Sequence, residues 1–104
     1  MSATSQYPWV ELGKKEDIPD GVYYAGADEI WLTRIAGERV AVSNVCPHKM
    51  GPISKGEIKG HFVRCPWHGY WFDIATGKCT PSLKLRMYEV KEEDGKVFVR
   101  LMES

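Results

Sequence analysis

Residues 29–43 read EIWLTRIAGERVAVS, and this stretch decides the class of fold. Residues 29–35 are rich in β-branched and aromatic side chains, and residues 39–43 follow the alternation of a half-buried strand. Between the two, Ala36-Gly37-Glu38 supplies a short turn that contains glycine. The stretch therefore predicts an antiparallel β-hairpin.

Strands are also predicted on both sides of this hairpin. Residues 22–25 predict a short strand, and residues 96–102 (KVFVRLM) predict a longer one after the polar turn 92–95. Residues 83–90 predict its hairpin partner, with a β-bulge where the apolar phase shifts. A helix is predicted only as a single turn at residues 14–18. The chain is therefore predicted to be all-β, a small antiparallel β-sandwich or partly open barrel.

Length and composition limit the classes of protein that remain. The 104 residues, 43% of them hydrophobic, suit a single domain spanning 1–104. Fourteen basic and fourteen acidic side chains give a net charge of zero, which argues against nucleic-acid binding. No apolar run approaches the ~20 residues that cross a bilayer, and residues 1–8 lack a signal-peptide pattern. We expect a cytoplasmic protein that binds neither nucleic acid nor membrane, with three cysteines that form no disulfide.

Residues 44–81 do not follow the β pattern. Glycines and prolines recur through this segment and break its apolar alternation. The segment predicts nearly forty residues of turns, which in a small domain usually mean a functional insertion.

Two loops of this segment each offer one thiolate and one imidazole. Cys46 and His48 lie in the first loop, Cys65 and His68 in the second, and sixteen residues separate His48 from Cys65. Such a set can hold zinc, copper or an iron–sulfur cluster. Zinc fingers commonly pair Cys with Cys and His with His. Here each loop pairs Cys with His, so a two-metal site can take both thiolates on one metal and both imidazoles on the other. A zinc-stabilised binding module stays the alternative.

The stretches CPHKMG at 46–51 and CPWHGYWFD at 65–73 resemble the cluster-binding loops of the Rieske [2Fe–2S] family. The resemblance covers essentially the whole chain. It implies a single Rieske domain, a β frame with a two-loop cluster-binding subdomain at about residues 44–81. It also implies one [2Fe–2S] cluster as cofactor, with Cys46 and Cys65 on the buried iron and His48 and His68 on the outer one.

Differences from the high-potential members of the family predict a low redox potential. In those members two further cysteines form a disulfide between the loops, and Gly51 and Trp67 stand at those positions here. A serine and a tyrosine that hydrogen-bond the cluster and its cysteine sulfur are replaced by Tyr70 and Phe72. Neutral imidazole ligands place Rieske centres at roughly −150 to +300 mV, but fewer donors at sulfur stabilise the reduced form less. We expect a midpoint toward the negative end of that range.

The same loops carry side chains that we expect beside the cluster or in contact with a partner. Met50, Pro52, Trp67 and Pro81 would form an apolar rim suited to a transient contact below about 1,200 Å². The zero net charge gives no sign for the partner's surface, and Trp71 is expected to pack and exclude water. The residues expected beside the cluster or in docking are Lys49, Met50, Trp67, Gly69, Tyr70, Trp71, Phe72 and Pro81.

Two further residues of chemical interest receive ordinary roles. Cys79 is predicted to be a partly buried small residue, in a third loop that the resemblance places over the cluster. His61 precedes Phe62 and is predicted to face solvent on a strand.

The resemblance implies electron transfer rather than catalysis. Proteins of this kind accept one electron at a time from a flavin-containing NAD(P)H-dependent reductase and pass it to a terminal oxygenase. The sequence offers no identifiable catalytic base or nucleophile, and 104 residues leave no room for the iron-binding catalytic domain of an oxygenase subunit. We expect a monomeric carrier. A small accessory subunit of a nitrite reductase-like or other redox complex is the alternative.

Overall fold

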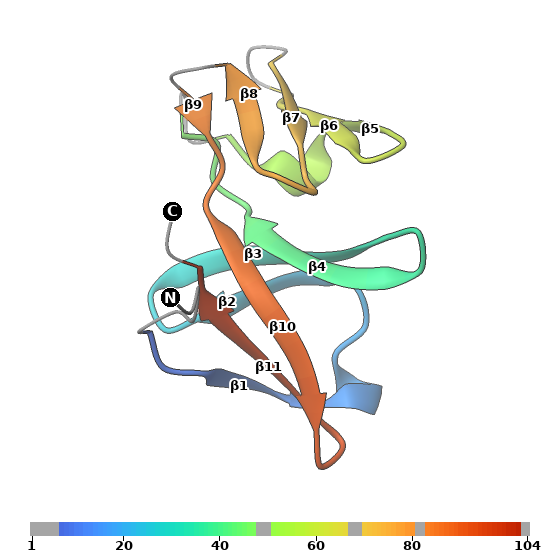
Figure 1. The fold of residues 1–104 in the computed structure, drawn as a ribbon, viewed down its shortest axis with the longest axis vertical. Coiled ribbons are helices and arrows are strands. Elements are labelled where there is room, and N and C mark those ends of the chain that lie inside the picture. The colour runs from blue at the N-terminus through green and yellow to red at the C-terminus, as the bar shows by residue number, and fades with distance from the viewer. Residues whose placement is uncertain (1–6, 48–50, 67–69, 81–82, 103–104) are drawn as a thin grey trace, which may run out of the picture.

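The structure is a computed structural model that describes residues 7–47, 51–66, 70–80 and 83–102. Figure 1 shows a large curved sheet, which we call the barrel, and a group of short strands at one end of the long axis. We call that group, residues 44–86, the loop part. The elements are β1 (Val10–Lys14), η1 (Lys15–Asp17), β2 (Gly21–Ala25), β3 (Asp28–Ile35), β4 (Glu38–Ser43), η2 (Ile53–Lys55), β5 (Glu57–Lys59), β6 (Phe62–Arg64), β7 (Trp71–Asp73), β8 (Lys78–Thr80), β9 (Leu83–Lys84), β10 (Met87–Glu93) and β11 (Lys96–Leu101). The predicted all-β class is confirmed.

Two hairpins of the barrel form where the sequence predicts turns. Ala36 and Gly37 join β3 to β4 with φ angles of 51° and 84°, and Asp94 and Gly95 join β10 to β11 with φ angles of 54° and 74°. Positive φ at both turn residues gives the two-residue hairpin whose twist matches that of its strands. Glycine adopts such angles without steric cost, which is why it occupies the second position of each turn.

The barrel is one antiparallel sheet with the strand order β1-β11-β10-β4-β3-β2. Its edge strands β1 and β2 contact each other, so the sheet curls almost to closure, as the predicted partly open barrel requires. β1 itself is not predicted from the sequence. The interior is a single cluster of buried side chains, namely Ile18, Ala25, Ile30, Leu32, Ala41, Tyr88, Val97 and Val99.

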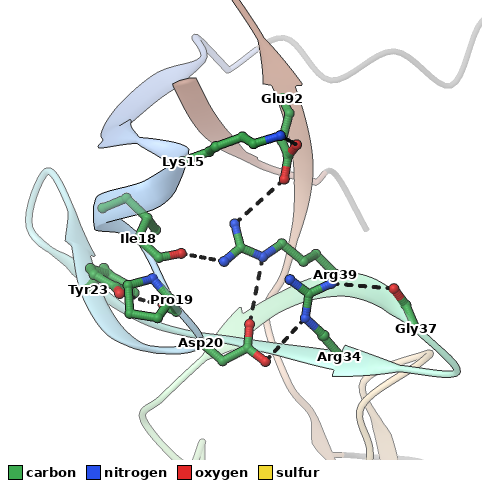
Figure 2. A network of polar contacts seen from close by, with 9 residues as sticks. All are labelled: Lys15, Ile18, Pro19, Asp20, Tyr23, Arg34, Gly37, Arg39 and Glu92. Atoms are coloured by element: carbon green, nitrogen blue, oxygen red, sulfur yellow. Dashed lines mark hydrogen bonds and ion pairs between the residues drawn. The ribbon is translucent and has the colours of Figure 1, made fainter. Parts of the chain in front are cut away.

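A polar network centred on Arg39 ties β4 to the segment after η1 and to β10 (Figure 2). The Arg39 side chain is only 10% exposed. Its guanidinium donates a hydrogen bond to the carbonyl of Ile18 and lies 3.6 Å from Asp20 and 3.8 Å from Glu92. Arg34 approaches Asp20 from the surface at 3.5 Å. Because its partners come from separate elements, Arg39 fixes the connection between β1 and β2 against the sheet.

The loop part holds more regular structure than the sequence predicts. β5, β6 and β7 form a three-stranded antiparallel sheet, and β8 pairs with β9 beside it. The expectation of turns throughout residues 44–81 is therefore wrong for these strands. Each of the strands β5 to β8 has three residues, which is too short for apolar alternation to be visible in the sequence.

The predicted bulged strand at 83–90 is two separate strands. β9 ends before Leu85, and β10 begins at Met87. Leu85 is buried in the group of side chains that contains Cys46 and Cys65, whereas Tyr88 is buried in the interior of the barrel. The shift in apolar phase therefore marks the passage of the chain from one core to the other, and the predicted bulge is wrong.

Helical structure among the described residues is limited to two short turns. η1 confirms the single turn predicted at residues 14–18, and η2 is an addition to the prediction. In this part of the chain no helix has the length and apolar character needed to cross a membrane.

Candidate metal centre

Two loops of the loop part are built alike. The first begins at Cys46, whose backbone N–H donates to the carbonyl of Gly51 at 2.9 Å. The second begins at Cys65, whose backbone N–H donates to the carbonyl of Tyr70 at 2.8 Å. Each hydrogen bond closes a loop that starts with Cys-Pro and contains a histidine. The two cysteines therefore occupy equivalent positions at the bases of their loops.

The two cysteines lie in one buried cluster of mostly apolar side chains. Cys46 and Cys65 are both 0% exposed, and no disulfide joins any two of the three cysteines. An apolar shell of this kind limits the access of water to a metal site. The remaining buried members of the cluster are Trp31, Val42, Ile53, Val63, Phe72, Ile74 and Leu85. The fold thus brings together two of the four predicted ligands, in surroundings that fit a pair of thiolate ligands.

The other two predicted ligands, His48 and His68, lie outside the described residues. The ligand set and the apolar rim therefore stay predictions. His61, the histidine that the structure describes, lies beside Asp73. Also outside the described residues are Lys49, Met50, Trp67, Gly69 and Pro81.

The described neighbours of the second loop range from buried to exposed. Phe72 is fully buried in the same cluster as the two cysteines, so it can face the site but cannot contact a partner. Trp71 is half-buried, and the Nζ of Lys59 lies 5.6 Å from the centre of its ring, while its role in excluding water stays a prediction. Tyr70 is 39% exposed, and Pro52 beside the first loop is half-buried. Tyr70 and Pro52 are therefore the described candidates for contact with a partner.

The first loop leads into η2, which packs closely against the strand before Cys65. Gly56 follows η2, and a Cβ atom at this position would lie 1.8 Å from the carbonyl oxygen of Arg64. The backbone N–H of Ser54 donates to the side-chain oxygen of the buried Asn44 at 2.8 Å. These contacts hold the end of the first loop against the start of the second.

A third loop carries Cys79 on β8. Cys79 is partly buried and packs against the same cluster, as predicted. Burial raises the pKa of the Cys79 thiol, and the charge of the nearby Cys46 raises this pKa further. The N–H of Leu85 donates to the carbonyl of Gly77 at 2.7 Å, which holds β8 near the core. Cys79 therefore behaves as a small, protonated packing residue.

A contact between His61 and Asp73 is a feature of the site region that the sequence does not predict. The Nδ1 atom of His61 lies 2.8 Å from the Asp73 carboxylate, which also accepts the N–H of Ala75 at 2.9 Å. Burial raises the pKa of Asp73, but the hydrogen bonds with His61 and Ala75 outweigh it, so the pKa lies below its ordinary value. The N–H of Ile74 donates to the carbonyl of His61 at 2.8 Å. These bonds fasten the ends of the two strands that flank the second loop.

His61 faces solvent, as predicted, but it lies in the turn before β6 rather than on a strand. Aspartate often accepts the amide two residues ahead of it in a turn, so the sequence offers a weak signal for the Asp73–Ala75 bond. Nothing local in the sequence points to the histidine twelve residues earlier.

This chain resembles known proteins in both sequence and fold. The Rieske [2Fe-2S] domain family matches residues 8–98. A relative from Ralstonia sp., the ferredoxin component of naphthalene 1,2-dioxygenase/salicylate 5-hydroxylase systems, is 34% identical over 99 residues, which are 89% of this chain and 95% of the relative. The Sphingomonas yanoikuyae B1 ferredoxin superposes with a TM-score of 0.69 at 28% identity, over 93% of this chain and 100% of that chain. A chain from the complex of reduced oxygenase and oxidized ferredoxin in carbazole 1,9a-dioxygenase gives a TM-score of 0.71 at 25% identity, over 92% of this chain and 95% of that chain. Because the family match spans most of this chain, the chain belongs to the Rieske [2Fe–2S] domain family.

Proposed function

We propose that this chain is a one-electron carrier, the ferredoxin component of a dioxygenase system. The observation that carries the proposal is the pair of matching loops, which bring Cys46 and Cys65 into one buried cluster without a disulfide. The Ralstonia relative, matched over 95% of its length, is a component of this kind and supports the assignment.

Four side chains would hold the cluster. Cys46 and Cys65 would bind one iron through their thiolates, and His48 and His68 would bind the other through ring nitrogens. When bound, the cluster supplies the capacity to take up and release a single electron. The chain's own residues keep water from the two sulfur atoms by burial and hold both loop bases closed through the N–H groups of the cysteines.

A low redox potential is part of the proposal. Phe72 is fully buried in the cluster of side chains that contains both cysteines, and its ring offers no hydroxyl group. Hydrogen bonds to sulfur favour the reduced state of an iron–sulfur centre, because they stabilise the added negative charge. The absence of a hydroxyl at residue 72 therefore supports a midpoint toward the negative end of about −150 to +300 mV.

The proposed carrier works as a monomer in the cytoplasm and has no enzymatic activity of its own. It would take its electron from a flavin-containing NAD(P)H-dependent reductase and deliver it to a terminal oxygenase. Solved complexes of an oxygenase with its ferredoxin, in carbazole 1,9a-dioxygenase, support an oxygenase as the acceptor.

Anaerobic purification followed by metal and sulfide analysis tests the cofactor. We expect a brown protein with about two iron and two sulfide per chain, and an EPR signal that appears on reduction with dithionite. A colourless, EPR-silent protein with one zinc per chain would instead establish a zinc-stabilised module.

Redox titration and size-exclusion chromatography test the remaining parts of the proposal. A midpoint well above about +150 mV would contradict the low potential. We expect the isolated chain to elute as a stable monomer. Instability that is relieved only by a permanent partner would identify an accessory subunit of a larger redox complex.

A further inference from the structure

The zero net charge of the chain conceals a separation of charge. Residues 44–86, the loop part, contain seven basic side chains and two acidic ones, a formal charge of +5. The remaining residues contain seven basic and twelve acidic side chains, a formal charge of −5. A neutral total is therefore compatible with a net positive charge on one part of the molecule.

The described residues of the loop part carry six basic and two acidic side chains and lie at one end of the longest dimension, whereas most of the acidic side chains lie in the barrel. The molecule measures 39 Å along that axis, and Figure 1 shows β5 to β9 at one end and the turn between β10 and β11 at the other. The acidic side chains of that turn and of η1 are interspersed with lysines, so the acidic charge is spread over the barrel and is not concentrated at this end. Glu16, Asp17 and Asp94 are exposed there, and none of them forms an ion pair within the described residues.

The basic side chains of the loop part are exposed and mostly uncompensated. Lys55, Arg64, Lys78 and Lys84 are exposed, and no carboxylate of the described residues lies within ion-pair distance of any of them. In contrast, the two acids of this part already have partners, since Glu57 lies 3.9 Å from Lys59 and Asp73 lies 2.8 Å from His61.

These cations lie beside the loops that would hold the cluster. Lys55 ends η2, which follows the first loop, and Arg64 directly precedes Cys65. Lys84 lines a groove of about 510 Å³ together with Pro47, which belongs to the first loop. Lys78 lies opposite Lys84 in the β8–β9 pair. Exposed basic side chains thus lie on η2, β6, β8 and β9, the elements next to the two cysteine loops.

We propose that the loop part docks on an acidic surface of the protein that accepts its electron, and that the charge separation turns this end toward the partner during encounter. The inference rests on the proposed carrier function, in which the acceptor is the terminal oxygenase. Complementary charge steers association and fixes orientation more than it adds affinity. The net charge of zero gives no sign for the partner's surface, and the proposal depends instead on the uneven distribution of charge along the chain.

Electron transfer from the reduced protein to two redox proteins of opposite surface charge tests this docking surface. The probes are cytochrome b5, whose haem edge is acidic, and cytochrome c, whose haem edge is basic, each followed by stopped-flow absorbance at low and high salt. The Debye length falls from about 30 Å at 0.01 M salt to about 10 Å at 0.1 M. We expect added salt to slow the reduction of cytochrome b5 and to accelerate that of cytochrome c.

Two matched double variants separate local charge from net charge. Lys78→Gln with Lys84→Gln removes a cross-strand lysine pair from the loop part, and Lys14→Gln with Lys96→Gln removes another such pair from the barrel. Both variants lower the net charge by the same amount. We expect the loop-part variant to slow the low-salt reduction of cytochrome b5 by about three- to tenfold, and the barrel variant to change it by less than about twofold.

Equal effects of the two variants, or rates that do not respond to salt, would overturn the docking proposal while leaving the carrier function intact. A preparation that holds no redox centre would contradict the carrier function itself, and with it this partner. Iron content and circular dichroism of each variant, compared with the unchanged protein, establish that the rates refer to folded, loaded protein.

Discussion

Substituting Gly56 by alanine tests whether close packing of η2 on β6 sets the geometry of the candidate metal centre. The φ angle of Gly56 is −83°, which any residue adopts, so alanine adds no backbone strain. Its Cβ atom, however, would lie 1.8 Å from the carbonyl oxygen and 2.9 Å from the carbonyl carbon of Arg64. Any effect of Gly56→Ala is therefore steric.

The size of the effect follows from the displacement that the new atom imposes. Real Cβ contacts do not fall below 3.0 Å, so Gly56 and Arg64 must separate by about 1.2 Å. Functional sites tolerate only about 0.5 Å of misplacement, and Cys65 directly follows Arg64. Overpacking of this kind costs about 1–3 kcal/mol. We expect Gly56→Ala to lose about 3 kcal/mol of unfolding free energy and most of its iron.

Gly60→Ala is the matched control. Gly60 has a φ angle of +60°, but a Cβ atom there meets nothing within 4 Å. The control costs about 1–2 kcal/mol through left-handed backbone strain and should keep its full iron content. Urea unfolding and iron analysis of both variants are the measurements. A Gly56→Ala protein as stable and as rich in iron as the unchanged protein would refute the steric reasoning.

Three further substitutions test individual contacts. Arg39→Met should cost about 2 kcal/mol of unfolding free energy in urea, because it removes a 10%-exposed guanidinium that joins three elements. Arg34→Ala on the surface should cost less than about 1 kcal/mol. Equal losses would contradict the central place of Arg39 in the network. Burial and the hydrogen bond to Asp28 raise the pKa of Tyr88 to about 12. The unfolded chain therefore releases this proton first, and the stability of the fold falls as the pH rises from about 10 to 12. Tyr88→Phe should lose about 1–2 kcal/mol of unfolding free energy at pH 7, and its stability in urea titrations should fall less steeply at high pH. Because the pKa of Asp73 is lowered, its carboxylate stabilises the fold at pH values above 3.8, and this stabilisation is lost as the pH falls. Asp73→Asn should therefore lose less stability between about pH 5 and pH 3 than the unchanged protein. Parallel pH profiles of the two proteins would show that Asp73 does not contribute in this way.

Features of the fold that depend on local chemistry can be predicted from the sequence. The hairpin at residues 29–43 is an example, since its turn residues Ala36 and Gly37 adopt the positive φ angles that the turn requires. The Cys-Pro loops are another, because the spacing of cysteine and histidine is visible without a structure. Both cysteines are buried in one group of side chains, and the shared ligand set stays a prediction.

Features that depend on contacts between distant residues are not predictable in this way. The strands β5, β6 and β7 have three residues each. They are stabilised by pairing with one another and not by the intrinsic strand propensity of their residues. The break between β9 and β10 reflects two separate cores, which only the folded chain defines. The contact between His61 and Asp73 joins the turn before β6 to the end of β7, which the pairing of these two strands brings together. The uneven distribution of charge is present in the sequence, but its meaning depends on the long axis of the fold.

Mixed cysteine and histidine ligation is the central claim, and pulsed EPR on the dithionite-reduced protein with 15N-labelled histidine tests it most directly. We predict couplings from two histidine nitrogens to the reduced centre. If the variants His48→Cys and His68→Cys retain a cluster, each should lose one of these couplings. A reduced centre without histidine nitrogen coupling, or a spectrum that neither substitution changes, would contradict the account.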